Sequence, residues 1–223
     1  MTCKIIDHAQ LRNQTCVFKD RTHAGTILAD ELRPHMGPVM RLLALAAGGI
    51  PVGHAVSERI GIALEVAVVR KIQIPWDTEA GFGAVSWDGS VVLNDALGRD
   101  LGLTASQIDN CVYRTRQIVS ERIQRFAKGK PPEILDQTIV LVDDGLASGY
   151  TMMAAVESVR KGKPRRIIVA VPTGSRGAVQ LVSTKVDLLI CLNIRAGPVF
   201  AVADAYEEWH DLTDEEVVRY LQE

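Results

Sequence analysis

The chain lacks most of the features that mark disulfide-stabilised, metal-binding or membrane-embedded proteins. Its four cysteines lie far apart and form no C-x-x-C pair, which favours reduced thiols in a cytosolic protein over a disulfide framework or a zinc site. No apolar run approaches the roughly 18 residues typical of a membrane span, and the opening segment MTCKIIDHAQ lacks the apolar core of a secretion signal. We therefore expect a cytoplasmic protein that does not enter a membrane.

An excess of charge of one sign is also lacking. The 25 basic residues nearly balance the 27 acidic ones, for a net charge of −2, and this argues against nonspecific binding to nucleic acid or to an anionic membrane. The five histidines show no i, i+4 ligand spacing, so we expect them on the surface or on helix faces. With 47% hydrophobic and 23% charged residues, the composition is that of an ordinary globular domain.

What is present is an alternation of buried strands with helices. Near-continuous apolar segments predict strands at 39–45, 63–72, 138–142, 166–171 and 187–192. Helices are expected at 20–35, 51–60, 149–160, 175–184 and 213–222. Asp20 is the expected N-cap of the first helix, and Pro51 is expected at the first position of the second. The pattern predicts an open, parallel α/β sheet with helices on both faces.

The pattern changes between about residues 72 and 137. Residues 82–95 alternate around Asp88-Gly89, a strong hairpin signal. A long helix follows at 104–128, and Thr104 with Gln107 forms the capping box that opens it. We expect a single domain over 1–223 with this hairpin-plus-helix insertion. The amphipathic helix is a candidate homodimer interface.

The segment IVLVDDGLASGYTM, residues 139–152, carries the clearest chemistry. An apolar strand ends at two adjacent carboxylates, Asp143 and Asp144, and a loop of small residues then leads into a helix. Open α/β sheets bind ligands at such strand ends, and the glycines and the helix start direct several N–H groups at an anion such as phosphate. A carboxylate facing the vicinal hydroxyls of a sugar accepts two hydrogen bonds. A ribose 5-phosphate satisfies both halves of the segment.

The segment contains neither the G-K-[ST] of an ATPase P-loop nor G-x-G-x-x-G. It resembles instead the signature of type I phosphoribosyltransferases, which use 5-phosphoribosyl-1-pyrophosphate (PRPP). Other pieces are similar to a little-characterised branch of that family, and they reach from about residue 18 to 217: FKDRTHAGTILA, GGIPVG, VVRKI, EAGFGAV and YEEWHDLTDEEV. The resemblance implies a phosphoribosyltransferase-like fold.

The resemblance also implies roles for individual residues. Asp143 and Asp144 would hold the ribose hydroxyls and act in catalysis together with Lys71. The implied 5-phosphate loop consists of Gly145, Leu146, Ala147, Ser148, Gly149, Tyr150 and Thr151. The implied cofactor is Mg²⁺, which bridges pyrophosphate oxygens and ribose hydroxyls without a direct protein ligand.

A second loop consists of Ala46, Ala47, Gly48 and Gly49, and it closes another strand before another helix. In the family this loop holds the pyrophosphate of PRPP, whereas on its residues alone a tight strand-to-helix turn is an equally good interpretation. The family usually has an arginine where this chain has Ala47. The loss of such a charge-assisted clamp on a phosphate costs about 1.5–3 kcal/mol, so this departure weakens the case for catalysis more than the case for the fold.

Two cations stand at the end of the second buried strand, and a turn-rich segment comes after them. Arg70 and Lys71 stand where a cation can partly replace the missing arginine, although a solvated strand end explains Arg70 well. Residues 73–83 resemble the mobile loop that closes over the site, with Trp76 and Glu79 as candidates for substrate contact.

The aromatic residues Phe200, Tyr206 and Trp209, near the C-terminus, fit either a base pocket or a packing cluster. The cluster is the simpler interpretation.

Two functions stay open at this point. An enzyme would transfer ribose 5-phosphate to or from a nitrogenous base, with PRPP or a nucleotide as substrate and pyrophosphate as leaving group. The sequence does not identify the nucleobase acceptor. The alternative is a non-catalytic module that senses PRPP or a nucleotide and has lost pyrophosphate contacts, which Ala47 favours. The intact Asp143, Asp144 and Lys71 favour the enzyme.

Overall fold

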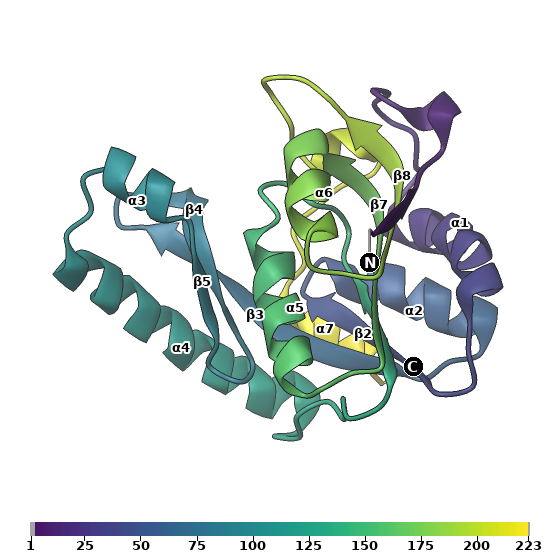
Figure 1. The fold of residues 1–223 in the computed structure, drawn as a ribbon, viewed down its shortest axis with the longest axis horizontal. Coiled ribbons are helices and arrows are strands. Elements are labelled where there is room, and N and C mark those ends of the chain that lie inside the picture. The colour runs from purple at the N-terminus through teal and green to yellow at the C-terminus, as the bar shows by residue number, and fades with distance from the viewer. Residues whose placement is uncertain (1–2, 223) are drawn as a thin grey trace.

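A computed structural model describes residues 3–222, with the backbone alone at 78 and 79, and places eight strands in one sheet in the order β1-β8-β7-β6-β2-β3-β4-β5 (Figure 1). The strands are β1 (Lys4–Ile6), β2 (Met40–Ala46), β3 (Leu64–Ile74), β4 (Asp77–Ser86), β5 (Val91–Leu93), β6 (Thr138–Val142), β7 (Arg166–Ser175) and β8 (Leu188–Arg195). Neighbours from β1 to β3 pair in parallel, and β4 and β5 add an antiparallel edge. The predicted open α/β sheet is confirmed.

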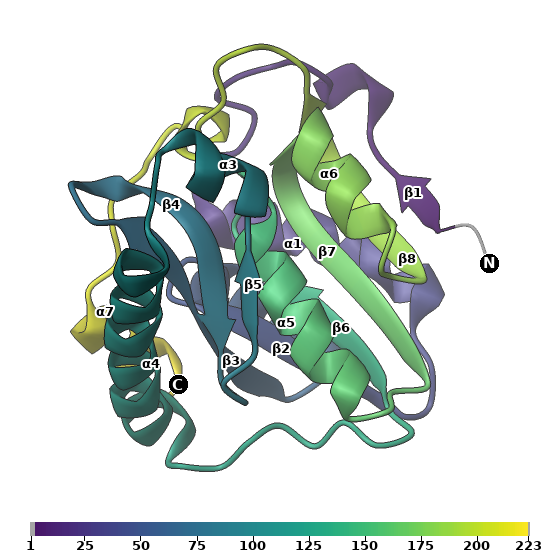
Figure 2. The same cartoon turned by 60° about the vertical axis from the view of Figure 1, so that its left-hand side comes forward.

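Helices cover both faces of this sheet (Figure 2). The α-helices are α1 (Arg21–Leu32), α2 (Gly49–Ile60), α3 (Asp95–Asp100), α4 (Ala105–Ala127), α5 (Tyr150–Lys161), α6 (Arg176–Ser183) and α7 (Asp214–Tyr220), and short 3-10 turns lie at Ala9–Leu11, Arg33–His35 and Ala203–Ala205. Helices α5 and α6 pack on one face, while α1, α2, α4 and α7 pack on the other. Each central strand therefore buries both of its faces, which explains its continuous apolar sequence.

The helix starts agree with the sequence analysis except at α2. The Asp20 side chain accepts a hydrogen bond from the backbone N–H of His23 and caps α1. The capping box predicted for α4 is formed, and Thr213 with Glu216 forms another at the start of α7. Helix α2 begins at Gly49, so Pro51 is its third residue and not its first as predicted. The reason is that the loop after β2 turns into the helix without a spacer.

The insertion is more regular than predicted. Strand β3 continues to Ile74, the chain reverses at Pro75 and Trp76, and β4 returns antiparallel to it. Residues 73–83, expected as a mobile loop, thus belong largely to a hairpin. Burial explains the correction, since Ile72, Ile74 and Phe82 are all buried and their pairing outweighs the turn-forming residues between them.

The second turn of the insertion is the predicted one. Gly89 has a φ of +80°, which glycine adopts without strain, and Ser86 N–H and Ser90 C=O pair across it at 2.9 Å. The short helix α3 after β5 was not predicted.

Helix α4 uses its apolar face inside the chain. Val119 and Phe126 are buried in a cluster with Val68 of β3 and Val217 of α7. The amphipathic pattern that suggested a dimer interface is accounted for by this packing, and a homodimer stays a prediction.

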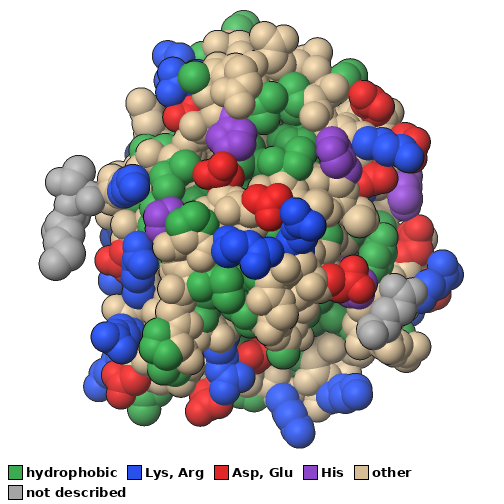
Figure 3. All heavy atoms as spheres, turned by 90° about the vertical axis from the view of Figure 1, so that its right-hand side faces the viewer, with side chains coloured by type: hydrophobic (Ala, Val, Ile, Leu, Met, Phe, Trp, Pro, Cys, Tyr) green, Lys and Arg blue, Asp and Glu red, His purple; other side chains and the backbone are tan. Residues whose placement is uncertain are grey.

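Outside the insertion the surface is mixed in charge. On the face that contains α1 and α2, acidic and basic side chains lie close to one another (Figure 3); one such pair joins Arg59 to Asp30 at 3.0 Å. None of the helices within residues 3–222 combines the length and apolar character needed to cross a bilayer.

Candidate active site

The two sequence-predicted loops meet at one cavity of about 500 Å³. It opens at the carboxyl ends of β2, β3 and β6, where ligands of open α/β sheets bind. Its walls come from the loop after β2, the end of β3, the acidic pair after β6, helix α4 and the C-terminal segment. The lining residues are Arg21, Ala46, Ala47, Gly48, Val69, Arg70, Lys71, Gln73, Arg122, Asp143, Asp144, Thr151, Val202, Trp209, Asp211 and Leu212.

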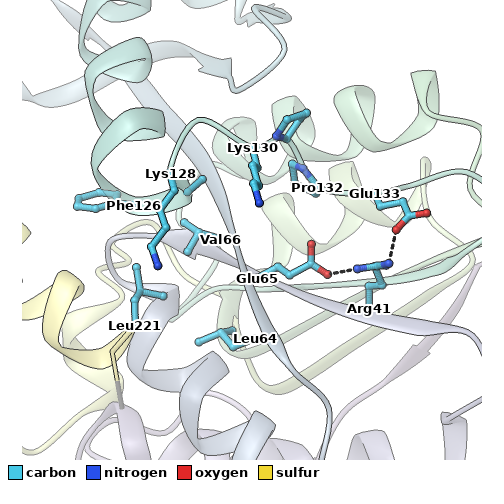
Figure 4. A pocket seen from close by; sticks show the side chains of 12 residues that line it. Arg41, Leu64, Glu65, Val66, Phe126, Lys128, Lys130, Pro132, Glu133 and Leu221 are labelled. Carbon is cyan, nitrogen blue, oxygen red and sulfur yellow. Dashed lines mark hydrogen bonds and ion pairs between the residues drawn. The ribbon is translucent and has the colours of Figure 1, made fainter.

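A second cavity, of about 400 Å³, lies at the opposite edge of the sheet, where β2 and β3 begin (Figure 4). There the Arg41 guanidinium lies between Glu65, at 2.8 Å, and Glu133. Both of its carboxylates therefore pair with a cation already. This cavity has neither a glycine-rich loop nor an acidic pair at a strand end, so we place the candidate site at the carboxyl edge.

The acidic pair is held by contacts at several of its atoms. Asp143 Oδ1 accepts a hydrogen bond from the Asp144 backbone N–H at 2.9 Å, and Asp144 Oδ2 accepts one from Arg21 Nε at 2.9 Å. The Tyr206 hydroxyl donates to the Asp144 carbonyl oxygen at 2.6 Å. These contacts fix the main chain at the end of β6 and the direction of the Asp144 carboxylate.

The same environment makes two negative charges costly. Burial raises the pKa of Asp143 well above its usual value, and the neighbouring Asp144 charge raises it further. Burial also raises the pKa of Asp144, although the Arg21 charge and its hydrogen bond oppose that shift. Such a pair is stabilised by ligand groups that donate hydrogen bonds, because each hydroxyl offsets part of the lost hydration. A vicinal diol supplies two of them.

The loop at 145–151, predicted to bind the 5-phosphate, is anchored by its second residue. The Leu146 side chain is buried in the core, its N–H donates to the Thr173 carbonyl at 2.9 Å, and its carbonyl accepts from the Ser175 N–H at 2.9 Å. Leu146 therefore ties the loop to β7, and its own N–H is already used. Ala147 and Ser148 next to it are exposed.

The remaining donors of the loop lie at the start of α5. Gly149 has a φ of +84°, and the first helical hydrogen bond runs from the Met153 N–H to the Gly149 carbonyl. The N–H groups of Tyr150 and Thr151 consequently have no acceptor within the helix, and the positive end of the helix dipole adds to their attraction for an anion. Thr151 lines the cavity.

The loop after β2 contacts the acidic pair directly. A Cβ atom on Gly48 would lie 2.1 Å from Asp144 Oδ2, and one on Gly49 would lie 2.7 Å from the Val142 carbonyl oxygen. The Ala46–Ala47 peptide bond is cis. Glycine is needed at position 48 because the Asp144 carboxylate occupies the space that a side chain would take. A strand-to-helix turn without a neighbouring acidic pair would not need glycine for this reason.

Arg21, which the sequence analysis did not single out, connects three parts of the site. Besides its pair with Asp144, its Nη1 donates to the His210 carbonyl at 2.9 Å, and its guanidinium lies 3.7 Å from the centre of the Trp209 ring. Its side chain is only 8% exposed. The only sequence signal was its position directly after the cap residue Asp20, which marks a helix start and not a site.

Arg122 was also missed. It lines the cavity from α4, and its Nη2 donates to Asp214 Oδ1 at 2.8 Å. It lies three residues after Val119 and four before Phe126, on the apolar face of the helix, so a charge on that face was the available signal.

Some of the other predicted residues line the cavity and some do not. Arg70 and Lys71 line the cavity, as does Trp209, whose ring lies 5.1 Å from that of Tyr206. The Phe200 ring instead lies beside Arg195, with its centre 5.2 Å from the guanidinium carbon. Trp76 is 61% exposed at the tip of the β3–β4 hairpin, and the Glu79 side chain is outside the described residues.

Comparison with known proteins now decides the family. Residues 87–203, just over half of the chain, match the family model described as phosphoribosyl transferase domain. The chain belongs to the phosphoribosyl transferase family. The matched part of the chain includes the acidic pair and residues 145–151, whereas the loop after β2 and strand β3 lie before it.

Relatives cover most of the chain. Proteins from two Mycobacterium tuberculosis strains, provisionally named phosphoribosyl transferases, are each 35% identical over 206 residues, which is 92% of this chain and 46% of theirs. The chain thus spans about half the length of the curated relatives it matches. The crystal structure of TT1426 from Thermus thermophilus is 33% identical, with a TM-score of 0.73, and the match covers 92% of this chain and 97% of that one.

Proposed function

We propose that this phosphoribosyl transferase transfers ribose 5-phosphate between PRPP and a nitrogenous base, with Mg²⁺ as cofactor and pyrophosphate as leaving group. One observation carries the proposal: the close packing of Gly48 against Asp144. It brings a loop suited to a diphosphate and an acidic pair suited to a diol to the same cavity, and the 5-phosphate loop continues from the acidic pair.

The site fits PRPP group by group. The 5-phosphate would accept hydrogen bonds from the N–H groups at 147–151, which lie in the loop before α5 and in its first turn. The ribose hydroxyls would donate to Asp143 and Asp144, and Arg21 keeps the second carboxylate turned toward the cavity. The pyrophosphate would lie over residues 46–49, with Lys71 near it.

The donor set also fits a metal that arrives with the substrate. Within residues 3–222, no three or more His, Cys, Asp or Glu side chains form a group able to hold a metal ion, so Mg²⁺ would be held mainly by ligand oxygens. When bound, Mg²⁺ neutralises charge on the pyrophosphate as it leaves.

The chain's own residues would stabilise the charges that develop during the reaction and would keep water away from ribose C1. As the bond from ribose C1 to pyrophosphate breaks, positive charge develops on the sugar ring, and Asp143 and Asp144 stabilise it from the diol side. Lys71 offsets negative charge on the leaving group. Closure of the β3–β4 hairpin, with Trp76 at its tip, would exclude water from C1.

A non-catalytic sensor of PRPP or of a nucleotide is the second candidate, and Ala47 is the observation that favours it. The test is to incubate the protein with PRPP, Mg²⁺ and a panel of nucleobases and to measure released pyrophosphate. The double variant Asp143→Asn with Asp144→Asn is the control, because both changes keep the side-chain size. Release with at least one base in the wild type alone supports the enzyme, and tight PRPP binding without any release supports the sensor.

A further inference from the structure

Arg70 is partly buried in the wall of the cavity. Among residues 3–222, none forms a hydrogen bond or an ion pair with its guanidinium. Two interpretations of Arg70 were open from the sequence, a cation in place of the missing arginine and a solvated strand end, and its partial burial removes much of the water that the second one needs. A desolvated cation without an anion is unfavourable.

A second cation makes the position of Arg70 still less favourable. Arg122 lines the same cavity with a side chain that is 17% exposed. Burial lowers the pKa of Arg70, and the Arg122 charge lowers it further, while Asp214 opposes the shift. Asp214 in turn is shared by Arg122, at 2.8 Å, and Arg125, at 3.1 Å. Arg125 also pairs with Glu215, so two carboxylates face three guanidinium groups, and this wall of the cavity has an excess of positive charge.

The position of this positive charge along the sheet edge indicates which part of a ligand it would contact. Strand β3 lies next to β2, and neighbouring strands are about 4.8 Å apart. Going along the sheet edge from β6 to β2 to β3, the cavity wall changes from the acidic pair to residues 46–48 and then to Arg70 with Arg122. A ligand bound by its diol at Asp143 and Asp144, with its diphosphate over the β2 loop, would extend that diphosphate toward the two arginines.

We propose that Arg70 and Arg122 form the anion subsite for the pyrophosphate group of PRPP, in place of the cation absent at Ala47. The proposal rests on the function proposed above. Asp214 acts as a positioning residue, because it holds one end of the Arg122 guanidinium and leaves its other N–H groups to a ligand.

The test is calorimetric titration of the full chain with inorganic pyrophosphate in the presence of Mg²⁺. Arg70→Met and Arg122→Met keep side-chain length and remove the charge, and each should weaken pyrophosphate binding by about tenfold or more. Arg125→Met is the matched control. It removes a cation from the same helix and from the same Asp214, but Arg125 does not line the cavity, so binding should stay within about twofold of the wild type.

Titration with ribose 5-phosphate separates this proposal from the proposed function. All three variants should bind ribose 5-phosphate as the wild type does, because the arginines lie beyond the β2 loop. Pyrophosphate binding unchanged in Arg70→Met and Arg122→Met overturns the subsite while leaving the function intact. Failure of the wild type to bind ribose 5-phosphate overturns the function, whereas a selective loss of pyrophosphate binding still supports the subsite. If Arg122→Met does not fold, Arg70→Met alone decides.

Discussion

Gly48 and Asp144 approach so closely that a methyl group added to Gly48 would lie 2.1 Å from a carboxylate oxygen of Asp144. The two residues belong to loops that follow different strands, and their contact places the loop proposed to bind the diphosphate beside the acid proposed to bind the diol. The geometry of the whole site depends on this approach.

Gly48→Ala should therefore disable the site. The Asp144 carboxylate would have to move away from Arg21, so we expect at least a tenfold loss of PRPP affinity and a loss of stability of about 1–3 kcal/mol. Gly37→Ala is the control, because a Cβ at Gly37 meets nothing within 4 Å. Calorimetry with PRPP and denaturant unfolding measure both effects. Unchanged PRPP affinity in Gly48→Ala would show that the two loops do not act together.

Asp143→Asn should stabilise the free protein at neutral pH. The pKa of Asp143 in the folded chain is raised, first by burial, so the folded state retains a proton that the unfolded state has already lost. Between the unfolded pKa, near 3.9, and the higher folded pKa, the stability of the wild type falls as pH rises. Asparagine does not titrate, and its side-chain oxygen still accepts from the Asp144 N–H.

The measurement is the melting temperature of both proteins from pH 4 to pH 8. The advantage of Asp143→Asn should grow with pH and then level off above the folded pKa. An advantage that is constant with pH would show that Asp143 is not destabilised by its charge.

Arg21→Met should make ligand binding more sensitive to acid. Without the Arg21 charge, the pKa of the buried Asp144 rises, because that charge opposes the effect of burial. PRPP affinity should then fall more steeply in the variant than in the wild type as pH is lowered from 8 to 6. Breaking a buried ion pair also costs about 3–5 kcal/mol, so melting must be recorded first. Parallel pH profiles of the two proteins would argue that Arg21 only supports the fold.

Asp88→Asn should weaken the tie between the insertion and α5. Burial alone would raise the pKa of Asp88, but hydrogen bonds from Ser158, Ser90 and Lys161 lower it to about 2. The stabilisation is complete above the unfolded pKa and is lost as pH falls toward 2. After a reduction for solvent screening, we expect a loss of about 1–2 kcal/mol at pH 7 and a smaller one at pH 3. Denaturant unfolding at both pH values checks this, and an equal loss at both would contradict it.

The sequence predicted those parts of the site that are local in the chain. Asp143, Asp144 and the following loop are contiguous, and an apolar strand before them and a helix after them fix their place at the sheet edge. The β3–β4 hairpin was missed because Pro75, Asp77 and Gly81 are typical of a loop, while the burial that opposes them appears only when the strands pair.

The long-range parts were not predictable from local pattern. Arg21 is 123 residues from Asp144 in sequence, and Tyr206 is 62 residues from it. Trp209 was recognised as aromatic, but its place at the cavity depends on the Arg21 guanidinium stacked against it. For Arg70 a solvated strand end stayed open beside the role of a replacement cation, because nothing in the sequence shows that it shares a cavity with Arg122 of α4.

The most direct test of the account is a crystal structure of the protein with ribose 5-phosphate. We predict the phosphate on the N–H groups at 147–151 and the 2- and 3-hydroxyls within hydrogen-bond distance of Asp143 and Asp144. A sugar that turns its hydroxyls away from both carboxylates, or a cavity without ligand at saturating concentration, would contradict it.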